Sequence, residues 1–311
     1  MARRTNGNGN GTRTRSTRRT LYTARPQNGR KTPVPQGTLI IIGGHEEKEG
    51  KAVILRAVAE GAKRGKVVVA TLATSDPEES FKEYQRVFTS MGVKQAVHLA
   101  VNDRADLLRN PRLDLLEGAS VVFFTGGGQL KITTQFGGTQ LCEQIQEFYR
   151  RGGTIAGTSA GASVMSDTML VSGEGDATHR VGANLLMAPG LGYIKDVIID
   201  QHFAERGRIG RLLGAVAQNP RFLGIGLDEN TAIVVEKEKR LIVLGAGAVY
   251  IIDGREVTCS NITEETEDRT LSIFNVRLHV LSQGDEFDLE TRSPMSGKPE
   301  EAEKELTPDL N

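Results

Sequence analysis

TIAGTSAGASVM, which runs from Thr154 to Met165, is the stretch of sequence that decides the fold. It contains the G-x-S-x-G pentapeptide Gly157-Thr158-Ser159-Ala160-Gly161 between β-branched residues and small residues that suit a helix. This order predicts a strand, a sharp turn at the serine and a helix, which lifts the hydroxyl out of the sheet top. Glycines flank the serine because a side chain would collide with backbone in so tight a turn. On the pentapeptide alone, a Gly/Ser-rich turn without chemistry remains an alternative.

Strand and helix patterns alternate on both sides of this motif. Apolar runs typical of strands covered on both faces lie at residues 38–42, 67–70, 121–124 and 197–200. Helical spacing covers residues 51–64, 77–91, 103–110, 141–151 and 206–218, and shorter strand patterns lie at 97–99, 223–227, 232–236, 241–244, 249–252 and 274–281. The alternation predicts an α/β domain with a doubly wound, mostly parallel central sheet flanked by helices.

Three small-residue motifs follow predicted strands at their carboxyl ends. Gly43-Gly44 follows the first strand, Gly126 to Gly128 follow the strand at 121–124, and Ser159 follows the strand of the pentapeptide. Ligands of open parallel sheets bind outside the carboxyl ends of the strands. We therefore expect the three motifs to line one crevice.

Charge is distributed unevenly along the 311 residues, which carry 39 basic and 39 acidic side chains. Residues 1–45 contain nine Arg or Lys and no acid, whereas the end of the chain is rich in glutamate. With 38% hydrophobic residues, the part between has enough apolar material for one core. We expect a disordered basic arm over residues 1–35, a single α/β domain over 36–293 and a flexible acidic tail over 294–311.

The sequence also excludes several classes of protein. No apolar stretch approaches the length of a membrane span, and the N-terminal arginines lack the apolar segment of a secretory signal. Two cysteines, Cys142 and Cys259, make neither a disulfide framework nor a metal motif. Nucleotide-binding glycine fingerprints are missing. We expect a cytoplasmic homodimer without metal, cofactor or membrane contact, and with nucleic acid an unlikely partner.

A serine nucleophile needs a base, and histidine is the usual one. His202 is the strongest candidate because it comes directly after a buried strand, where an imidazole can reach a serine at a neighbouring strand end. His98 and His279 lie in alternating apolar runs, so we expect structural roles for them. His45 follows Gly43-Gly44 and is placed to line the crevice.

The third member of such a site is a carboxylate that fixes the imidazole tautomer. Asp228 and Glu229 both follow the predicted strand at 223–227, and the sequence leaves the choice between them open. Either choice gives the order serine, histidine, acid. The α/β-hydrolases that share the serine motif have the order serine, acid, histidine, so a lipase or esterase is disfavoured.

Four sequence blocks together carry a resemblance to a known family. They are FFTGGGQ (123–129), GTSAGAS (157–163), DQHFAERGRIGRL (200–212) and GIGLDENTA (224–232). In this order they resemble the cyanophycinases, which belong to the serine peptidase family that also contains peptidase E, an aspartyl dipeptidase. The resemblance spans residues 36–283 and implies a sheet of the flavodoxin-like, class I glutamine amidotransferase-like kind.

The resemblance implies roles for particular residues and a substrate. Ser159 would be the nucleophile, His202 the base, Glu229 the acid and Gln129 a further active-site residue. The substrate would be cyanophycin, a poly-aspartate backbone that carries arginine on its β-carboxyls, and the products β-Asp-Arg dipeptides. Cyanophycinases often have a small residue where this chain has His45.

The motifs also predict oxyanion and substrate contacts. Backbone N–H groups of Gly127, Gly128 and Ala160 are candidate oxyanion donors. Guanidinium groups close to the base suit free carboxylates, such as those of the arginyl side chains or of a chain terminus. We expect the substrate to contact Gln129, Asp200, Gln201, Arg206, Arg208 and Arg211.

Some alternatives stay open at this point. The guanidinium groups of the substrate need acidic partners, for which the sequence offers Glu46, Glu47, Glu174 and Asp176. A second function is an aspartyl dipeptidase that acts on small α-aspartyl peptides. A third, of another class, is a polyanion-binding protein that acts through the basic arm at 1–35.

Overall fold

The structure is a computed structural model that describes residues 1, 37–62, 65–101, 103–171, 185–263 and 269–295. The predicted basic arm, apart from Met1, and the tail beyond residue 295 lie outside the described residues. Glu174 and Asp176 lie outside them as well. All that follows concerns the unit that begins at Val34.

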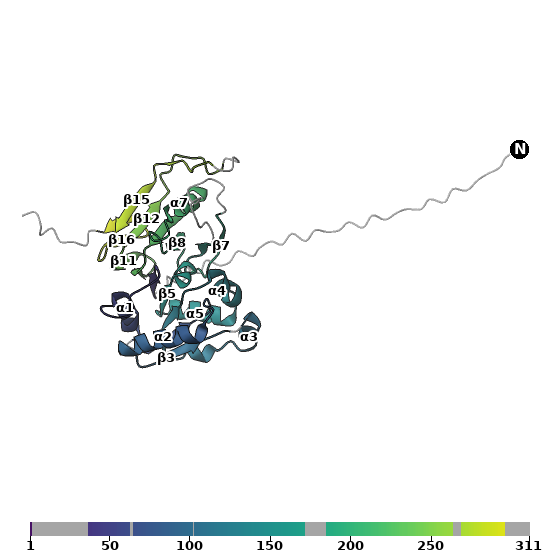
Figure 1. The fold of residues 1–311 in the computed structure, drawn as a ribbon. Coiled ribbons are helices and arrows are strands. Elements are labelled where there is room, and N and C mark those ends of the chain that lie inside the picture. The colour runs from purple at the N-terminus through teal and green to yellow at the C-terminus, as the bar shows by residue number, and fades with distance from the viewer. Residues whose placement is uncertain (2–36, 63–64, 102, 172–184, 264–268, 296–311) are drawn as a thin grey trace, which may run out of the picture. The chain divides into compact units, whose positions relative to one another are not determined.

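A sheet of nine strands forms the centre of the described domain (Figure 1). Its parallel strands are, in spatial order, β1 (Thr38–Ile42), β5 (Thr154–Thr158), β4 (Ala119–Phe124), β2 (Lys66–Ala70) and β3 (Ala96–Leu99). On the other side of β1 the sheet continues with the antiparallel strands β10 (Thr231–Glu236), β11 (Arg240–Gly245), β16 (Glu286–Asp288) and β17 (Ser293–Met295). The short motif after β1 therefore lies near the middle of the sheet.

Helices cover both faces of the parallel part. Ile40 and Ile42 of β1 pack in one cluster with α1 (Val53–Gly61) and α2 (Pro77–Ser90). Leu39 and Ile41 point the other way, into a cluster with α4 (Gln129–Phe136) and α5 (Gln140–Arg150). Successive side chains of a strand alternate between faces, so a strand that is apolar at every position must be covered on both sides.

Local sequence signals place the helix ends. Asp76 caps α2 by accepting the N–H of Glu79 at 3.2 Å, and proline occupies the first position of the helix. Thr139 caps α5 in the same way through the N–H of Cys142 at 3.2 Å. The remaining short helices are α3 (Arg104–Arg109), the 3₁₀ turn η1 (Leu113–Leu116) and α6 (Ala160–Ser163).

A second sheet packs beside the first. Its strands are, in order, β15 (Arg277–Leu281), β12 (Val249–Asp253), β9 (Leu223–Leu227) and β8 (Val197–Gln201). Ile199 and Ile225 on its inner side join the cluster under the central sheet. Helix α7 (Ile209–Gln218) covers its outer side, where Leu212 packs with Ile198. Two small ladders pair β6 (Thr168–Leu170) with β7 (Met187–Pro189) and β13 (Cys259–Ser260) with β14 (Ile273–Phe274).

The predicted α/β class with a mostly parallel central sheet is confirmed by this architecture. Four details differ from the sequence prediction. The strands at 197–201 and 223–227 belong to the second sheet, the helix predicted over 206–218 begins at Ile209, and α4 was not predicted. The strand predicted over 274–281 is divided at Asn275, whose φ of 61° interrupts the extended backbone.

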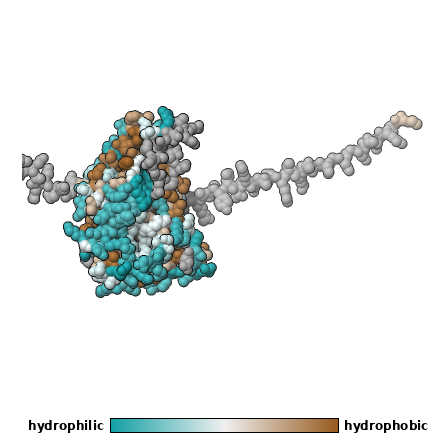
Figure 2. All heavy atoms as spheres, viewed as in Figure 1, coloured by the Kyte–Doolittle hydropathy of each residue, from teal (hydrophilic) through white to brown (hydrophobic). Residues whose placement is uncertain are grey.

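Hydrophilic side chains dominate the lower part of Figure 2, over α2 and α3. Hydrophobic side chains gather along the upper edge, where β15 lies. Leu278 and Val280 of β15 are 51% and 57% exposed. Within the described residues, no helix has the length and apolar character that crossing a bilayer requires.

Candidate active site

Ser159 occupies a strained turn between β5 and α6. Its φ of 53° and ψ of −111° lie outside the regions that residues with side chains ordinarily adopt. A Cβ on Gly157 would lie 2.5 Å from the carbonyl oxygen of Gly161, and one on Gly161 would lie 2.3 Å from that of Phe124. Both flanking glycines are therefore required by backbone contact, as the sequence predicts.

Three side chains from distant segments form one hydrogen-bonded line. Oγ of Ser159 lies 3.0 Å from Nε2 of His202, and Nδ1 of His202 lies 2.6 Å from Oε1 of Glu229. The serine follows β5, the histidine follows β8 and the glutamate follows β9. This is the geometry of a nucleophile, a base and an orienting acid.

The carboxyl end of β1 holds the three segments together. The carbonyl oxygens there accept the backbone N–H groups of Ser159, of His202 and of the residue that follows Glu229. The bonds run from Ser159 to Ile42 (3.0 Å), from His202 to Gly43 (2.9 Å) and from Asn230 to Gly44 (2.8 Å). The predicted convergence of strand ends on one crevice is confirmed, and a single strand end sets the spacing between the two sheets.

Gly44 is a site residue whose role the sequence alone did not specify. Its φ is 105°, and a Cβ there would lie 2.3 Å from Cε1 of His202. The imidazole lies directly against this glycine, so only a residue without a side chain leaves room for the ring. The Gly-Gly pair after a buried strand was the available signal.

The surroundings keep His202 neutral and Glu229 ionised. Burial lowers the pKa of His202 below its ordinary 6.5, although the hydrogen bond to Glu229 opposes that effect; the positive charge of Arg206 adds to the lowering. Partial burial favours a higher pKa for Glu229, but hydrogen bonds from His202 and His45 outweigh it and hold that pKa below its usual value. A neutral imidazole can accept the serine proton at neutral pH.

Asp228 has a different task from its neighbour. Its Oδ1 accepts the N–H of Ala204 at 2.9 Å, and its Oδ2 accepts the N–H of Ala248 at 3.0 Å. The carboxylate therefore braces the turn after β8 against the segment before β12. Of the two acids that the sequence left open, Glu229 is the one that contacts the imidazole.

The predicted oxyanion donors are placed unequally. Gly127 and Gly128 lie in the wall of a pocket beside Ser159, and Ala160 follows the serine as the first residue of α6. The N–H of Gly128 is donated to the carbonyl oxygen of Ala73 at 3.0 Å, which does not agree with a role as oxyanion donor. Gly127 and Ala160 remain as candidates.

The pocket beside Ser159 has a volume of about 300 Å³. Gln129, Gln201 and all three predicted arginines line it, together with the serine and a few small or apolar residues. The charged residues among the described lining are all arginine. Nε2 of Gln129 donates to the carbonyl oxygen of Leu170 at 2.9 Å, which fixes its amide in the pocket wall.

Asp200 does not line this pocket, and its predicted contact with substrate is corrected here. Its side chain is 1% exposed and pairs with two guanidinium groups, those of Arg208 and Arg211. Nε of Arg211 lies 2.6 Å from Oδ2, while Nη1 of Arg208 lies 3.2 Å from Oδ1. A buried charge requires such partners. Asp200 therefore acts on the pocket indirectly, by holding the two arginines in its wall.

The suggestion that Glu46 could bind a guanidinium of the substrate is also corrected, because its side chain is buried. Its carboxylate accepts the hydroxyl protons of Tyr84 and Thr158, both at 2.5 Å. Thr158 directly precedes the nucleophile, so this buried carboxylate supports the strained turn from below. Glu47 remains exposed, with Oε2 accepting the N–H of Ala52 at 3.0 Å.

His98 has the structural environment that was predicted. Its Nε2 lies 2.7 Å from the hydroxyl of Thr71, and its ring stacks on Phe81 with centroids 4.4 Å apart. His279 packs edge-on against Phe287. Neither imidazole contacts Ser159.

His45 lies beside His202 and Glu229. One ligand atom each from His45, His202 and Glu229 falls within 4.8 Å of the others, a spacing that one cation could bridge. The expectation that the chemistry needs no metal stays a prediction.

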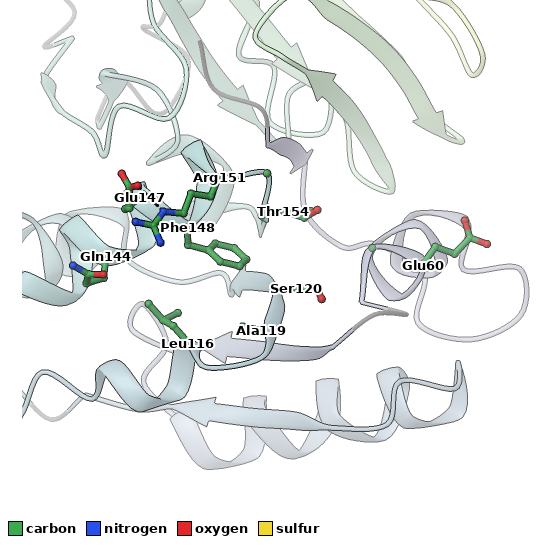
Figure 3. Close-up of a pocket in the computed structure, with 12 residues that line it drawn as sticks. Glu60, Leu116, Ala119, Ser120, Gln144, Glu147, Phe148, Arg151 and Thr154 are labelled. Atoms are coloured by element: carbon green, nitrogen blue, oxygen red, sulfur yellow. Dashed lines mark hydrogen bonds and ion pairs between the residues drawn. The ribbon is translucent and has the colours of Figure 1, made fainter. Parts of the chain in front are cut away.

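A larger pocket of about 800 Å³ lies at the opposite end of the parallel strands (Figure 3). Ser120 and Thr154 contribute hydroxyls near the amino ends of β4 and β5. Its described lining residues include no histidine or cysteine, and the guanidinium of Arg151 points to Glu147, 2.7 Å away. Glu147 is paired with Arg150 and Arg151, and no imidazole among the described lining residues lies beside the two hydroxyls, so the candidate active site is the smaller pocket.

Comparison with known proteins identifies the family. The model of peptidase family S51 matches residues 39–243, a span that contains Ser159, His202 and Glu229. This chain belongs to peptidase family S51. The predicted serine peptidase family is thereby confirmed.

Individual relatives agree with this assignment. The cyanophycinase of Trichormus variabilis is 39% identical over 266 residues, which cover 83% of this chain and 89% of the relative. That of Geminocystis herdmanii is 35% identical over 266 residues, which cover 84% and 97%. Among solved structures, a peptidase from an acI-B1 Actinobacterium superposes with a TM-score of 0.60 at 20% identity, over 82% of this chain and 98% of that one. The predicted resemblance to cyanophycinases is confirmed, and the solved structure supports the fold.

Proposed function

We propose that this chain is a cyanophycinase, a serine peptidase that cleaves the poly-aspartate backbone of cyanophycin and releases β-Asp-Arg dipeptides. The observation that carries the proposal is the line from Ser159 through His202 to Glu229, with separations of 3.0 and 2.6 Å. The cyanophycinases that match most of this chain at 35–39% identity support the choice of substrate.

Catalysis begins when Oγ of Ser159 attacks a backbone carbonyl carbon and its proton passes to Nε2 of His202. Glu229 stabilises the imidazolium that forms and holds Nδ1 in its protonated tautomer. The N–H groups of Ala160 and Gly127 donate to the oxyanion of the tetrahedral intermediate. Collapse of the intermediate expels the amine, which takes the proton from His202, and leaves an acyl group on Ser159. Water, activated by the same imidazole, then hydrolyses this ester.

The pocket beside the serine supports a substrate with free carboxylates. Each arginine of cyanophycin carries one, because it is attached to the backbone through its amino group. Arg206 is exposed and offers a planar fork of N–H donors that matches a carboxylate in a two-point contact, while Arg208 and Arg211, which pair with Asp200, add positive charge to the same wall. Gln129 and Gln201 add neutral polar groups in the same wall. We assign these five side chains to substrate binding.

The test is degradation of purified cyanophycin by the full chain, with β-Asp-Arg measured by liquid chromatography and mass spectrometry. Wild-type enzyme should release the dipeptide, and Ser159→Ala should lose this activity at least 10³-fold. Ser163→Ala is the matched control, since it removes a buried hydroxyl from the adjacent helix α6 and should retain activity. Turnover by Ser159→Ala at the wild-type rate contradicts the proposal.

Two further experiments distinguish the proposed function from the two alternatives. Release of products from small α-aspartyl dipeptides, with cyanophycin left intact, would indicate an aspartyl dipeptidase instead. Deletion of residues 1–35 should leave turnover of cyanophycin nearly unchanged. A large loss of turnover would favour a polyanion-binding role for the basic arm.

We also propose that the enzyme is a cytoplasmic homodimer in which β15 forms the interface between the two subunits. This strand is the last of its sheet within the described residues, and Leu278 and Val280 expose apolar side chains there. Exposed apolar sheet edges are prone to pair with another chain. Light scattering should give twice the chain mass for wild type and the monomer mass for Val280→Lys, and a wild-type monomer would contradict this.

A further inference from the structure

We propose that His45 is a positioning residue of the active site, which holds the carboxylate oxygen of Glu229 that His202 does not contact. The inference rests on the proposed triad and adds a fourth side chain to it. It assigns a role to a residue beside the crevice that the mechanism above does not use.

The geometry of the Glu229 carboxylate supports this role. Nδ1 of His202 lies 2.6 Å from Oε1, while Nδ1 of His45 lies 2.8 Å from Oε2. The two imidazole rings meet edge to face, with centroids 5.0 Å apart. Each oxygen of the carboxylate is therefore engaged by one ring, and its plane is fixed by two hydrogen bonds.

A glutamate needs this second contact because its side chain has an additional rotatable bond compared with aspartate. The carboxylate lies at the edge of the protein, where the side chain of Glu229 is 27% exposed. With only the bond to His202, rotation about the last side-chain bond would exchange its oxygens and move the imidazole with them. His45 removes this freedom without touching the reacting atoms.

The backbone places His45 for this contact. It follows Gly44 at the end of β1 with a φ of 47°, a left-handed conformation that turns the chain back over the crevice. The next segment is tied down by the N–H of Glu47, which donates to Oδ1 of Asn230 at 2.9 Å. The segment of His45 and the segment of Glu229 are thus joined on both sides of the contact between the two side chains.

Charged groups around His45 and Glu229 come from two segments. The turn after β8 contributes His202, Arg206 and Glu205, whose carboxylate accepts the N–H of Glu229 at 3.1 Å. The segment of His45 itself contributes Glu47, which is exposed, and Glu46, which is occupied by Tyr84 and Thr158. A positive charge on His45 lowers the pKa of both Glu229 and His202.

The test compares His45→Ala with His45→Asn in cyanophycin hydrolysis, with chelator present because three ligand atoms gather at this place. Asparagine keeps an N–H donor close to the position of Nδ1, whereas alanine removes it. We expect kcat to fall about fivefold in His45→Ala, with KM unchanged, because one exposed charge-assisted hydrogen bond is lost. His45→Asn should restore kcat to within about twofold of wild type.

Two readouts separate positioning from a general structural effect. In a Glu229→Ala background, which should itself be strongly impaired, His45→Ala should have no further effect on kcat, because the group it holds is gone. The acid limb of kcat/KM should move to higher pH in His45→Ala, since a positive neighbour of His202 has been removed. The side chain of His45 is 73% exposed, so both variants should fold, which thermal unfolding verifies.

An unchanged kcat in His45→Ala overturns the inference, as does an equal loss in His45→Asn. A change confined to KM also overturns it and makes His45 a substrate contact. None of these results bears on the proposed function, which fails only if Ser159→Ala retains full activity or cyanophycin is not degraded.

Discussion

Replacing Gly44 by alanine perturbs the catalytic imidazole without removing any catalytic group. The new Cβ would lie 2.3 Å from Cε1 of His202, whereas ordinary contacts begin at 3.4 Å. The ring must therefore retreat by about 1 Å, which lengthens the 3.0 Å contact with Ser159 or rotates it out of line. Misplacement of a reacting group by about 1 Å costs roughly 10²-fold in rate, or about 2.7 kcal/mol of activation free energy.

The positive φ of this glycine adds a cost in stability that must be separated from the effect on catalysis. Gly92 provides the matched control, because its φ of 86° is similar and a Cβ there meets nothing within 4 Å. Both alanine variants should lose about 1 to 2 kcal/mol of unfolding free energy from backbone strain. Gly44→Ala alone should lose catalysis.

The assay is steady-state hydrolysis of cyanophycin, with urea unfolding of the same preparations. We expect kcat of Gly44→Ala to fall about 10²-fold with KM within about twofold of wild type, and kcat of Gly92→Ala to stay unchanged. Full activity in Gly44→Ala would refute the reasoning. An equal loss in both variants would show that strain, and not contact with the ring, is responsible.

Three further predictions concern the acid, the base and the buried ion cluster. Glu229→Gln should lower kcat by about 10³- to 10⁴-fold at nearly unchanged stability, whereas Asp228→Asn should mainly lower the free energy of unfolding. The reverse result in kinetics and denaturation would show that Asp228, and not Glu229, orients the imidazole. His202 must be neutral to accept a proton, and its pKa lies below 6.5, so kcat/KM should fall only as pH drops through a midpoint below 6.5, and a midpoint above 7 would contradict this. Asp200→Asn leaves Arg208 and Arg211 buried without their carboxylate, so urea unfolding should show a loss of about 3 to 5 kcal/mol and kinetics a raised KM; a change in KM without loss of stability would mean that Asp200 contacts substrate.

The positions of Ser159 and His202 could be predicted because each follows a strand with a clear apolar pattern. Ser159 lies at the carboxyl edge of the central sheet, as expected for a residue after a parallel strand. His202 follows a strand of the second sheet, and it lies beside the serine because the backbone at the end of β1 accepts the N–H groups of both residues. The second sheet could not be foreseen in the same way. Buried strands at 197–201 and 223–227 have the same apolar pattern in either sheet, and nothing in that pattern states which neighbours they pair with.

The choice between Asp228 and Glu229 also exceeded what the sequence could decide. Adjacent residues at a strand end point in different directions, and the direction of each depends on the turn that follows, here with Asn230 at a φ of 47°. Asp200 was misjudged for a related reason. Whether a carboxylate faces the pocket or the interior depends on where Arg208 and Arg211 are placed by the turn and helix after β8.

The most direct measurement is covalent labelling of the enzyme by a serine-reactive organophosphonate, followed by peptide mapping with mass spectrometry. A serine activated by His202 should give one adduct, on the peptide that contains Ser159, with loss of hydrolysis in proportion to labelling. The adduct should be absent from His202→Ala. An active enzyme that is labelled at another residue, or that reacts at Ser159 equally well without His202, would contradict the proposed catalytic site.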